Sequence, residues 1–256
     1  HEGLVFALGD DRFDQRVATV CRRRVEEGGH QLPIGDQQVV VGVVVHQHVD
    51  QPAVEEIARA NGIDKDEAHR RARNNIQRIG ADFSMLGIKF LASILAPVWH
   101  IIYDGLDVDE DGLERVRAAA RDSRIVVIPS HKSHIDYLII SYVFFTRGLL
   151  PPHIAAGENL SFPPMGTIFR RAGAFFIRRQ FRDDPLYGLC VQRYMGKILQ
   201  EGHGIEFFIE GSRSRTGKLL SPRFGMLRMI VDSFLEEDFE RLKIVPANFT
   251  ARVRDI

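Results

Sequence analysis

The sequence predicts an α/β fold with a largely parallel or mixed central sheet, flanked by helices and preceded by a helical N-terminal segment. Three observations predict it. Short continuous apolar runs, such as residues 125–128 and 206–209, are typical of strands buried on both faces. Segments with helical spacing of apolar residues alternate with such runs from residue 123 onward. Residues 53–84 are charged and alanine-rich, which favours surface helices before the sheet.

The composition is that of a globular protein. The chain has 256 residues, of which 45% are hydrophobic and 27% are charged, and this excludes a disordered, collagen-like or disulfide-scaffold chain. Because 34 Lys and Arg residues balance 34 Asp and Glu residues, we expect no nucleic-acid partner, and any basic site must be a local cluster. Cys21 and Cys190 are isolated, which favours a reducing compartment over a cysteine zinc site.

Residues 1–51 form an unassigned N-terminal segment. The valine-rich run 39–45 has the composition of a strand, but nothing around it builds a recognisable unit. The opening residues HEGLVFALGDDR lack the basic start of a secretory signal peptide. We therefore draw no functional conclusion from this segment.

Residues 52–122 form a helical segment. Apolar residues recur at helical spacing within 53–84, and Gly62 separates two surface helices there. An apolar helix follows at 85–96. An acidic connection then leads to a short helix near 112–121.

The most apolar stretch is 85–103 (MLGIKFLASILAPVWHIIY), which a lysine, a proline and a histidine interrupt. A membrane-spanning helix needs roughly 20 apolar residues, and Pro97 would be a poor midpoint for one. Two readings stay open. The stretch can pack on the domain, or it can lie in the plane of a membrane with Trp99 and Tyr103 at the level of the headgroups.

Residues 123–256 form the α/β domain. Its strands are expected at 125–128, 153–156, 174–177 and 206–209, with a last strand that begins at 243–245. Its helices are expected at 135–145, 185–201 and 226–235. Asp184 and Pro185 suit the cap and the first position of the second of these helices, and Gly202 suits its end.

Polar residues come directly after three of these strands. Residues 129–136 (PSHKSHID) follow the first strand, Arg178 and Arg179 follow the third, and residues 210–215 (EGSRSR) follow the fourth. In open α/β sheets, ligands bind beyond the carboxyl ends of the strands. We therefore expect the three clusters to face a single crevice.

His131 and Asp136 are the candidate catalytic residues. They can meet if His131 lies in the turn after the strand and Asp136 in the first helical turn, because a regular helix would set them about 140° apart. Asp136 would then hold one ring nitrogen and leave the other to take a proton. No G-x-S-x-G motif is present, which favours direct activation of a substrate hydroxyl.

Two other readings of this cluster stay open. Ser130 or Ser133 can cap the helix, with Asp136 at its positive end and the histidines merely hydrogen-bonded. Alternatively, His131, His134 and Asp136 can be metal ligands, although no second histidine or cysteine cluster completes the shell. We expect no metal here.

Arginines gather around the third strand within thirteen residues. They are Arg170, Arg171, Arg178, Arg179 and Arg182. A guanidinium binds phosphate bidentately, so this cluster suits a phosphorylated ligand. Because neighbours on a strand point to opposite faces, at most one of Arg178 and Arg179 is expected to enter the crevice. The alternative is a solvated basic rim that pairs with Asp183 and Asp184.

Residues 210–215 are the densest polar cluster. Gly211 permits a tight turn, while Ser212 and Arg213 can supply a hydroxyl and a positive charge to a phosphate-bearing ligand. Glu210 would stay ionised and position an arginine or a substrate hydroxyl. The alternative is a basic surface loop.

Four motif blocks, in this order, resemble those of the glycerolipid acyltransferases. The H-x4-D block runs from His131 to Asp136, and the others are GAFFIRR at 173–179, FIEGSRSR at 208–215 and IVP at 244–246. The second and third blocks are long, and in this they resemble the branch of the family that acylates glycerol-3-phosphate or dihydroxyacetone phosphate. The resemblance covers 52–250. Family members continue well beyond the fourth block, which implies an α/β domain truncated at its C-terminus.

The resemblance implies transfer of a fatty acyl group from an acyl-CoA or acyl-carrier-protein thioester to the sn-1 hydroxyl of glycerol-3-phosphate, the first step of phospholipid synthesis. Acylation of dihydroxyacetone phosphate or a lysophospholipid is an alternative, as is a non-catalytic module that binds anionic lipids. No cofactor is implied beyond the thioester co-substrate. The expected location is peripheral, on the cytoplasmic face of a membrane.

The resemblance also implies a role for each site residue. His131 would be the base, and Asp136 would orient it. The substrate-binding residues would be Arg178, Arg179, Glu210, Gly211, Ser212 and Arg213. Pro246 would be structural, at the wall of the pocket.

Overall fold

The computed structural model describes residues 4–8, 51–101, 106–133, 136–214, 216, 218, 220–236 and 241–250. The predicted strand-like run 39–45 lies outside the described residues, as does Tyr103.

Within the described ranges, a sheet of seven strands forms the centre of the molecule. The strands are β1 (Leu4–Leu8), β2 (Leu106–Val108), β3 (Arg124–Pro129), β4 (His153–Gly157), β5 (Ala174–Ile177), β6 (Ile205–Glu206) and β7 (Leu242–Thr250). Their order across the sheet is β2-β1-β7-β3-β6-β4-β5. The last five of these are parallel, whereas β1 runs antiparallel to β7. The predicted fold class is confirmed.

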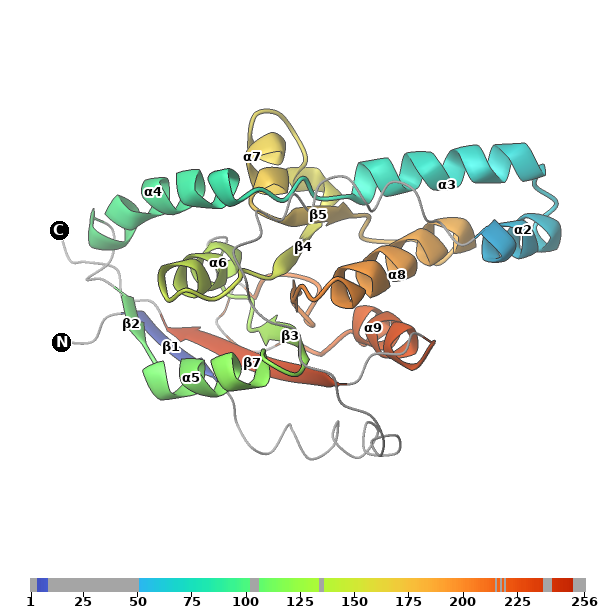
Figure 1. The fold of residues 1–256 in the computed structure, drawn as a ribbon. Coiled ribbons are helices and arrows are strands. Elements are labelled where there is room, and N and C mark those ends of the chain that lie inside the picture. Colours follow the sequence, from blue (N-terminus) through green and yellow to red (C-terminus); the bar gives the residue numbers. More distant parts are fainter. Residues whose placement is uncertain are drawn as a thin grey trace.

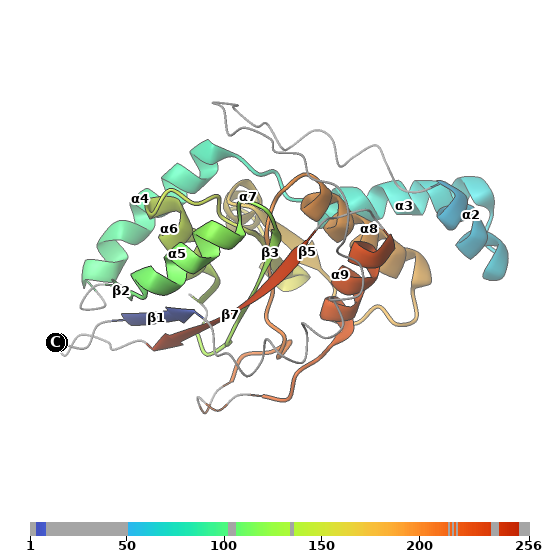
Figure 2. The same ribbon diagram turned by 60° about the horizontal axis from the view of Figure 1, so that its bottom comes forward.

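Helices cover both faces of the sheet. They are α2 (Gln51–Ala60), α3 (Lys65–Ile79), α4 (Met85–Ile101), α5 (Glu110–Ala119), α6 (Asp136–Thr146), α7 (Met165–Arg171), α8 (Pro185–Gln200) and α9 (Gly225–Glu236), with a short 3₁₀ helix at Glu158–Leu160. Figures 1 and 2 show α2, α3, α8 and α9 gathered together, with α4, α5 and α6 on the opposite side.

Alternation along the strands explains these two layers. Val126 and Ile128 of β3 belong to the core under α2, α3, α8 and α9, while Ile125 and Val127 belong to the core under α4 to α7. Because successive side chains of a strand point to opposite faces, a continuous apolar run serves two cores at once.

The caps of α8 follow the predicted chemistry. The helix begins at Pro185, and the Asp184 carboxylate accepts the N–H of Tyr187 at 3.0 Å. Gly202 lies just after the helix with a φ of +89°, in the left-handed region that favours glycine. Gly62 likewise separates α2 from α3 with a φ of +63°.

One predicted strand is wrong in its bounds. The run 206–209 was expected to be a strand, but β6 covers only Ile205–Glu206. The Phe207 N–H still bonds to the Val127 carbonyl at 3.1 Å, after which the Gly211 N–H bonds back to the Phe208 carbonyl at 3.0 Å. This turn takes the chain out of the sheet and toward the end of β3.

The apolar helix also differs from its prediction. It was expected to end at residue 96, but α4 continues through Pro97 to Ile101. Trp99 is only 1% exposed, which agrees with the reading that this stretch packs on the domain and excludes the alternative place of this side chain among lipid headgroups. The opposite face of α4 is apolar and exposed. Among the described residues, no helix is both long and apolar enough to cross a membrane.

Candidate active site

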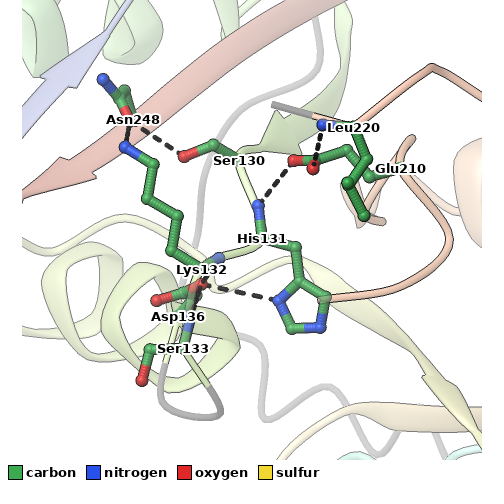
Figure 3. A network of polar contacts seen from close by, with 8 residues as sticks. All are labelled: Ser130, His131, Lys132, Ser133, Asp136, Glu210, Leu220 and Asn248. Carbon is green, nitrogen blue, oxygen red and sulfur yellow. Dashed lines mark hydrogen bonds and ion pairs between the residues drawn. The ribbon is translucent and has the colours of Figure 1, made fainter. Parts of the chain in front are cut away.

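Two loops meet beyond the carboxyl ends of β3 and β6, which are neighbours in the sheet. The loop after β3 carries His131, and the loop after β6 carries Glu210. The carbonyl of His131 accepts the Ser214 N–H at 2.9 Å, so the second loop folds over the first. Figure 3 shows the resulting polar network.

His131 and Asp136 lie side by side, as their spacing predicted. The Nδ1 atom of His131 is 3.5 Å from Oδ2 of Asp136. This Nδ1 atom is buried, whereas the side chain as a whole is 17% exposed, and Figure 3 shows Nε2 on the edge of the ring away from Asp136. The ring also stacks on Phe208, with 4.1 Å between the two centroids. Such an arrangement suits a general base that acts through Nε2.

Asp136 is fixed by its own backbone neighbourhood. Its carboxylate is 3% exposed and lies at the start of α6, where the helix favours a negative charge. Oδ2 accepts the N–H groups of Lys132 and Ser133, each at 2.6 Å. Because both N–H groups already donate to the Asp136 carboxylate, they are not available to a substrate oxygen. Any backbone donor for a developing oxyanion must come from elsewhere in the site.

Glu210 holds the main chain of the base. Its carboxylate is 4% exposed; Oε1 accepts the N–H of His131 and Oε2 accepts the N–H of Leu220, both at 2.9 Å (Figure 3). It was expected to position an arginine or a substrate hydroxyl. In the structure its carboxylate joins three segments of backbone around His131, and its role toward a substrate stays a prediction.

Gly211 is required by the turn that follows. Its φ is +65°, and a Cβ atom there would lie 2.9 Å from Cδ of Arg223. The side chains of Ser212 and Arg213 are exposed next to this turn. Because residues 210 and 214 both bond to the backbone of His131, Ser212 and Arg213 lie close to the base.

The two arginines after β5 are placed differently. Arg178 pairs with Asp184 at 3.0 Å and lies over the ring of Tyr187, 4.2 Å from its centroid. Arg179 is exposed and makes no hydrogen bond or ion pair with the described residues. β5 lies three strands from β3, which separates the two strand ends by about 14 Å. The cavity that Arg178 lines includes neither His131 nor Asp136.

Sequence reasoning missed two polar residues of this region. Oδ1 of Asn248 accepts from the Ser130 hydroxyl at 2.9 Å and from Nζ of Lys132 at 3.1 Å. Its position two residues after the fourth block, on a strand that adjoins β3, was the available signal.

The other missed residue is Glu206, which is fully buried, and neither of its carboxyl oxygens has a hydrogen-bond partner among the described residues. It pairs in register with Val127 and Ile154, so it lies on the α6 face of the sheet. Burial, with a contribution from the charge of Asp136, raises the pKa of Glu206 well above its ordinary value.

The residues that the metal reading invoked are only partly described. His134 lies outside the described residues. Among those that are described, no group of three or more His, Cys, Asp and Glu side chains is arranged to hold a metal ion.

Comparison with known proteins agrees with this architecture. Residues 107–250 match the family model described as Acyltransferase, and the chain therefore belongs to the acyltransferase family.

Its similar relatives carry a more specific name. The chain is 41% identical to a glycerol-3-phosphate acyltransferase of Aeromonas hydrophila over 243 residues, which are 93% of this chain and 30% of that protein. It is 39% identical to the protein of that name from Histophilus somni and 38% identical to that from Pasteurella multocida. Each of these two matches covers 90% of this chain and 28% of the relative. The chain thus spans about three tenths of the length of these relatives.

Proposed function

We propose that this chain carries the catalytic domain of a glycerol-3-phosphate acyltransferase. It would move a fatty acyl group from an acyl-CoA or acyl-carrier-protein thioester to the sn-1 hydroxyl of glycerol-3-phosphate, the first step of phospholipid synthesis. The observation that carries this proposal is the His131–Asp136 pair, in which Nδ1 faces the carboxylate and Nε2 lies on the other edge of the ring. The names of the relatives support the choice of acceptor.

The reaction needs one proton to move. Nε2 of His131 takes the proton of the acceptor hydroxyl as its oxygen attacks the thioester carbonyl. The new C–O bond forms, the C–S bond breaks, and the thiolate leaves with the proton that His131 held. Asp136 stabilises the imidazolium in between. Ser212 and Arg213, close to the base, are the first candidates to bind the acceptor phosphate.

The proposal includes no metal and no cofactor other than the thioester co-substrate. A chelator should therefore leave the rate of acyl transfer unchanged. A rate that falls on chelation and returns with added metal would contradict this part of the proposal.

We also propose that the protein acts at the cytoplasmic face of a membrane as a peripheral protein. Two observations support a lipid surface as the partner. The outer face of α4 exposes Leu86, Phe90 and Ile94 at a spacing of four, and Lys89 lies among them. The expected product, an acylated glycerol phosphate, is itself a membrane lipid.

The decisive experiment is His131→Ala, assayed with radiolabelled acyl donor and, in separate arms, glycerol-3-phosphate, dihydroxyacetone phosphate and a lysophospholipid. We expect transfer to fall by about 10²–10⁴-fold with every acceptor that the parent uses. His69→Ala, a histidine remote from the site, serves as the matched control. Unchanged transfer in His131→Ala would refute the catalytic role of His131. A parent that transfers to none of the acceptors would favour a module that only binds anionic lipids.

A further inference from the structure

An arginine outside all four motif blocks lies against the turn that follows Glu210. Residues 211–223, which we call the basic loop, carry three arginines and one lysine and no acidic residue. The far end of this loop returns to its beginning, because the Arg223 N–H bonds to the Ile209 carbonyl at 2.7 Å. Arg223 is therefore close to Gly211 in space, although twelve positions separate them in the sequence.

The side chain of Arg223 crosses the turn at Gly211. The point where a Cβ atom of residue 211 would lie is 2.9 Å from Cδ of Arg223 and 3.5 Å from its Nε. Because glycine has no side chain, the aliphatic part of the arginine rests directly on the backbone there. Glu210 and Ser214, on either side of this turn, bond to the N–H and to the carbonyl of His131 at 2.9 Å each. The guanidinium is thus held next to the loop that positions the base.

This guanidinium has no charge partner in the part of the chain that the structure describes. Arg223 is exposed, and its side chain makes no hydrogen bond or ion pair with the described residues. Glu210, the acid just before the basic loop, already accepts two backbone N–H groups. The arginine does not stabilise the next helix either, since α9 begins at Gly225 and the start of a helix disfavours a positive charge. The N–H donors of the guanidinium are therefore available to a ligand.

The length of the acceptor limits where its phosphate can lie. In glycerol-3-phosphate, roughly 5–6 Å separates the reacting oxygen from the phosphorus by ordinary bond dimensions. An acceptor whose hydroxyl meets Nε2 of His131 therefore has its phosphate close to the base, beside the loop that bonds to the His131 backbone. Guanidinium groups bind phosphate bidentately, and Arg223 adds a second one to that of Arg213 at the same turn.

We infer that Arg223 binds the phosphate of the acceptor together with Arg213, and that it is a substrate-binding residue outside the four motif blocks. This inference rests on the proposed function for the identity of the acceptor. It adds one residue to the predicted acceptor site and leaves the predicted roles of Arg178 and Arg179 as they are. It also gives Gly211 a second role, because a side chain there would displace Arg223 from the turn.

The test uses the full chain with two substitutions of the same residue. Arg223→Gln keeps much of the aliphatic stem and removes the charge, whereas Arg223→Lys keeps a positive charge. Arg228→Gln is the matched control, because Arg228 is exposed on α9 and pairs with Asp232 at 3.5 Å. Binding of glycerol-3-phosphate and, separately, of CoA is measured by calorimetry, without turnover.

The expected losses are specific to the acceptor. Glycerol-3-phosphate should bind about tenfold more weakly to Arg223→Gln, about threefold more weakly to Arg223→Lys, and within about twofold of the parent to Arg228→Gln. CoA should bind to all three variants within about twofold of the parent. In an active chain, Arg223→Gln should raise the acceptor's apparent KM about tenfold and leave the donor's apparent KM and kcat nearly unchanged.

The outcomes separate this inference from the proposed function. Glycerol-3-phosphate binding that depends on Arg223 in a chain without transferase activity would sustain the inference while the proposed function fails. A fall in kcat with both KM values unchanged would show that Arg223 only supports the turn, and this would overturn the inference. A parent that does not bind glycerol-3-phosphate, binding indifferent to Arg223→Gln, or an equal loss with CoA would overturn it as well.

Discussion

At the scale of single residues, Glu210 does most to fix where the base lies. Its two carboxylate oxygens accept N–H groups from His131 and Leu220, which are far apart in the sequence. Hydrogen bonds to a charged acceptor contribute more than neutral ones, and a buried donor that loses its partner is costly. The position of the imidazole therefore depends on a side chain that never touches the ring's reactive nitrogen.

Glu210→Gln should reduce the free energy of unfolding by about 1–3 kcal/mol. A glutamine offers one oxygen and one NH₂ group where two N–H donors converge, so one donor loses its acceptor. Denaturant unfolding measures the change. Glu236→Gln, which removes an exposed partner of Arg193, is the control and should cost less than about 1 kcal/mol. Equal effects of the two substitutions would mean that the Glu210 bonds contribute little.

Because of Glu206, the free energy of unfolding should fall as pH rises. Its raised pKa keeps the carboxyl neutral in the folded protein, whereas in the unfolded chain it ionises above about pH 4.5. The unfolded state then binds fewer protons, so the free energy of unfolding falls as pH rises, by about 1.4 kcal/mol per pH unit, until the folded-state pKa is reached.

Glu206→Gln removes the titrating group while it keeps the shape and the neutral charge of the side chain. Between pH 5 and pH 8, urea unfolding of this variant should lack the slope that Glu206 gives to the parent. Parallel curves for parent and variant would show that the carboxyl is ionised in the folded protein.

At the scale of elements, α4 has two apolar faces with different surroundings. Ile88, Leu91, Leu95 and Trp99 are buried against the domain. On the other side Leu86 is 76% exposed, with Phe90 and Ile94 also exposed. An exposed row of large apolar side chains marks an interaction surface more often than a solvent face.

Substituting Leu86, Phe90 and Ile94 together by Gln should weaken binding to anionic lipid vesicles at least about a hundredfold, because each buried apolar side chain contributes about 1.5–3 kcal/mol. Co-sedimentation with vesicles that contain phosphatidylglycerol measures this. Leu235→Gln, at an exposed apolar position on α9, is the control and should bind as the parent does. Vesicle binding that survives the triple substitution would exclude α4 as the lipid-binding face.

How well the sequence predicted each element depends on how local its signals are. Asp184, Pro185 and Gly202 define α8 through caps that act within one turn, and these bounds were correct to about a residue. β6 was overestimated because Phe207 and Phe208 look like strand residues. What ends the strand is a turn that packs on His131 and Arg223, and contacts this distant are not encoded locally.

The same distinction applies to the site. The contact between His131 and Asp136 could be predicted because both residues lie in one short segment. The Asn248 and Glu206 contacts could not, since they depend on which strands are neighbours. The strand order also sets β5, which Arg178 follows, three strands from β3. The single crevice that the sequence suggested stays a prediction.

At the scale of the whole molecule, a buried histidine pair lies at the end of the sheet away from the base. His153 and His203 have ring centroids 5.2 Å apart, and Phe83 stacks on both. Burial and the neighbouring His203 lower the pKa of His153 to about 3. Burial also lowers the pKa of His203, which Glu201 and Arg124 influence in opposite directions.

His153 should therefore reduce stability in mild acid, in opposition to the contribution of Glu206 over the same pH range. Below pH 6.5 the unfolded chain takes up a proton that folded His153 refuses, and the free energy of unfolding falls by about 1.4 kcal/mol per pH unit down to about pH 3. From His153 alone this is a loss of about 2 kcal/mol between pH 6.5 and pH 5. Urea unfolding at both values should show that the difference in free energy of unfolding between His153→Phe and the parent changes by about 2 kcal/mol between them. A difference that is the same at both pH values would contradict the assignment.

The carboxylate of Glu210 gives the amides of His131 and Leu220 one shared acceptor, and this has a consequence for motion. When that side chain swings away, both amide hydrogens become free to exchange with solvent deuterium in the same event. Their protection should rise and fall together across temperature and denaturant, although 89 positions of the chain separate them.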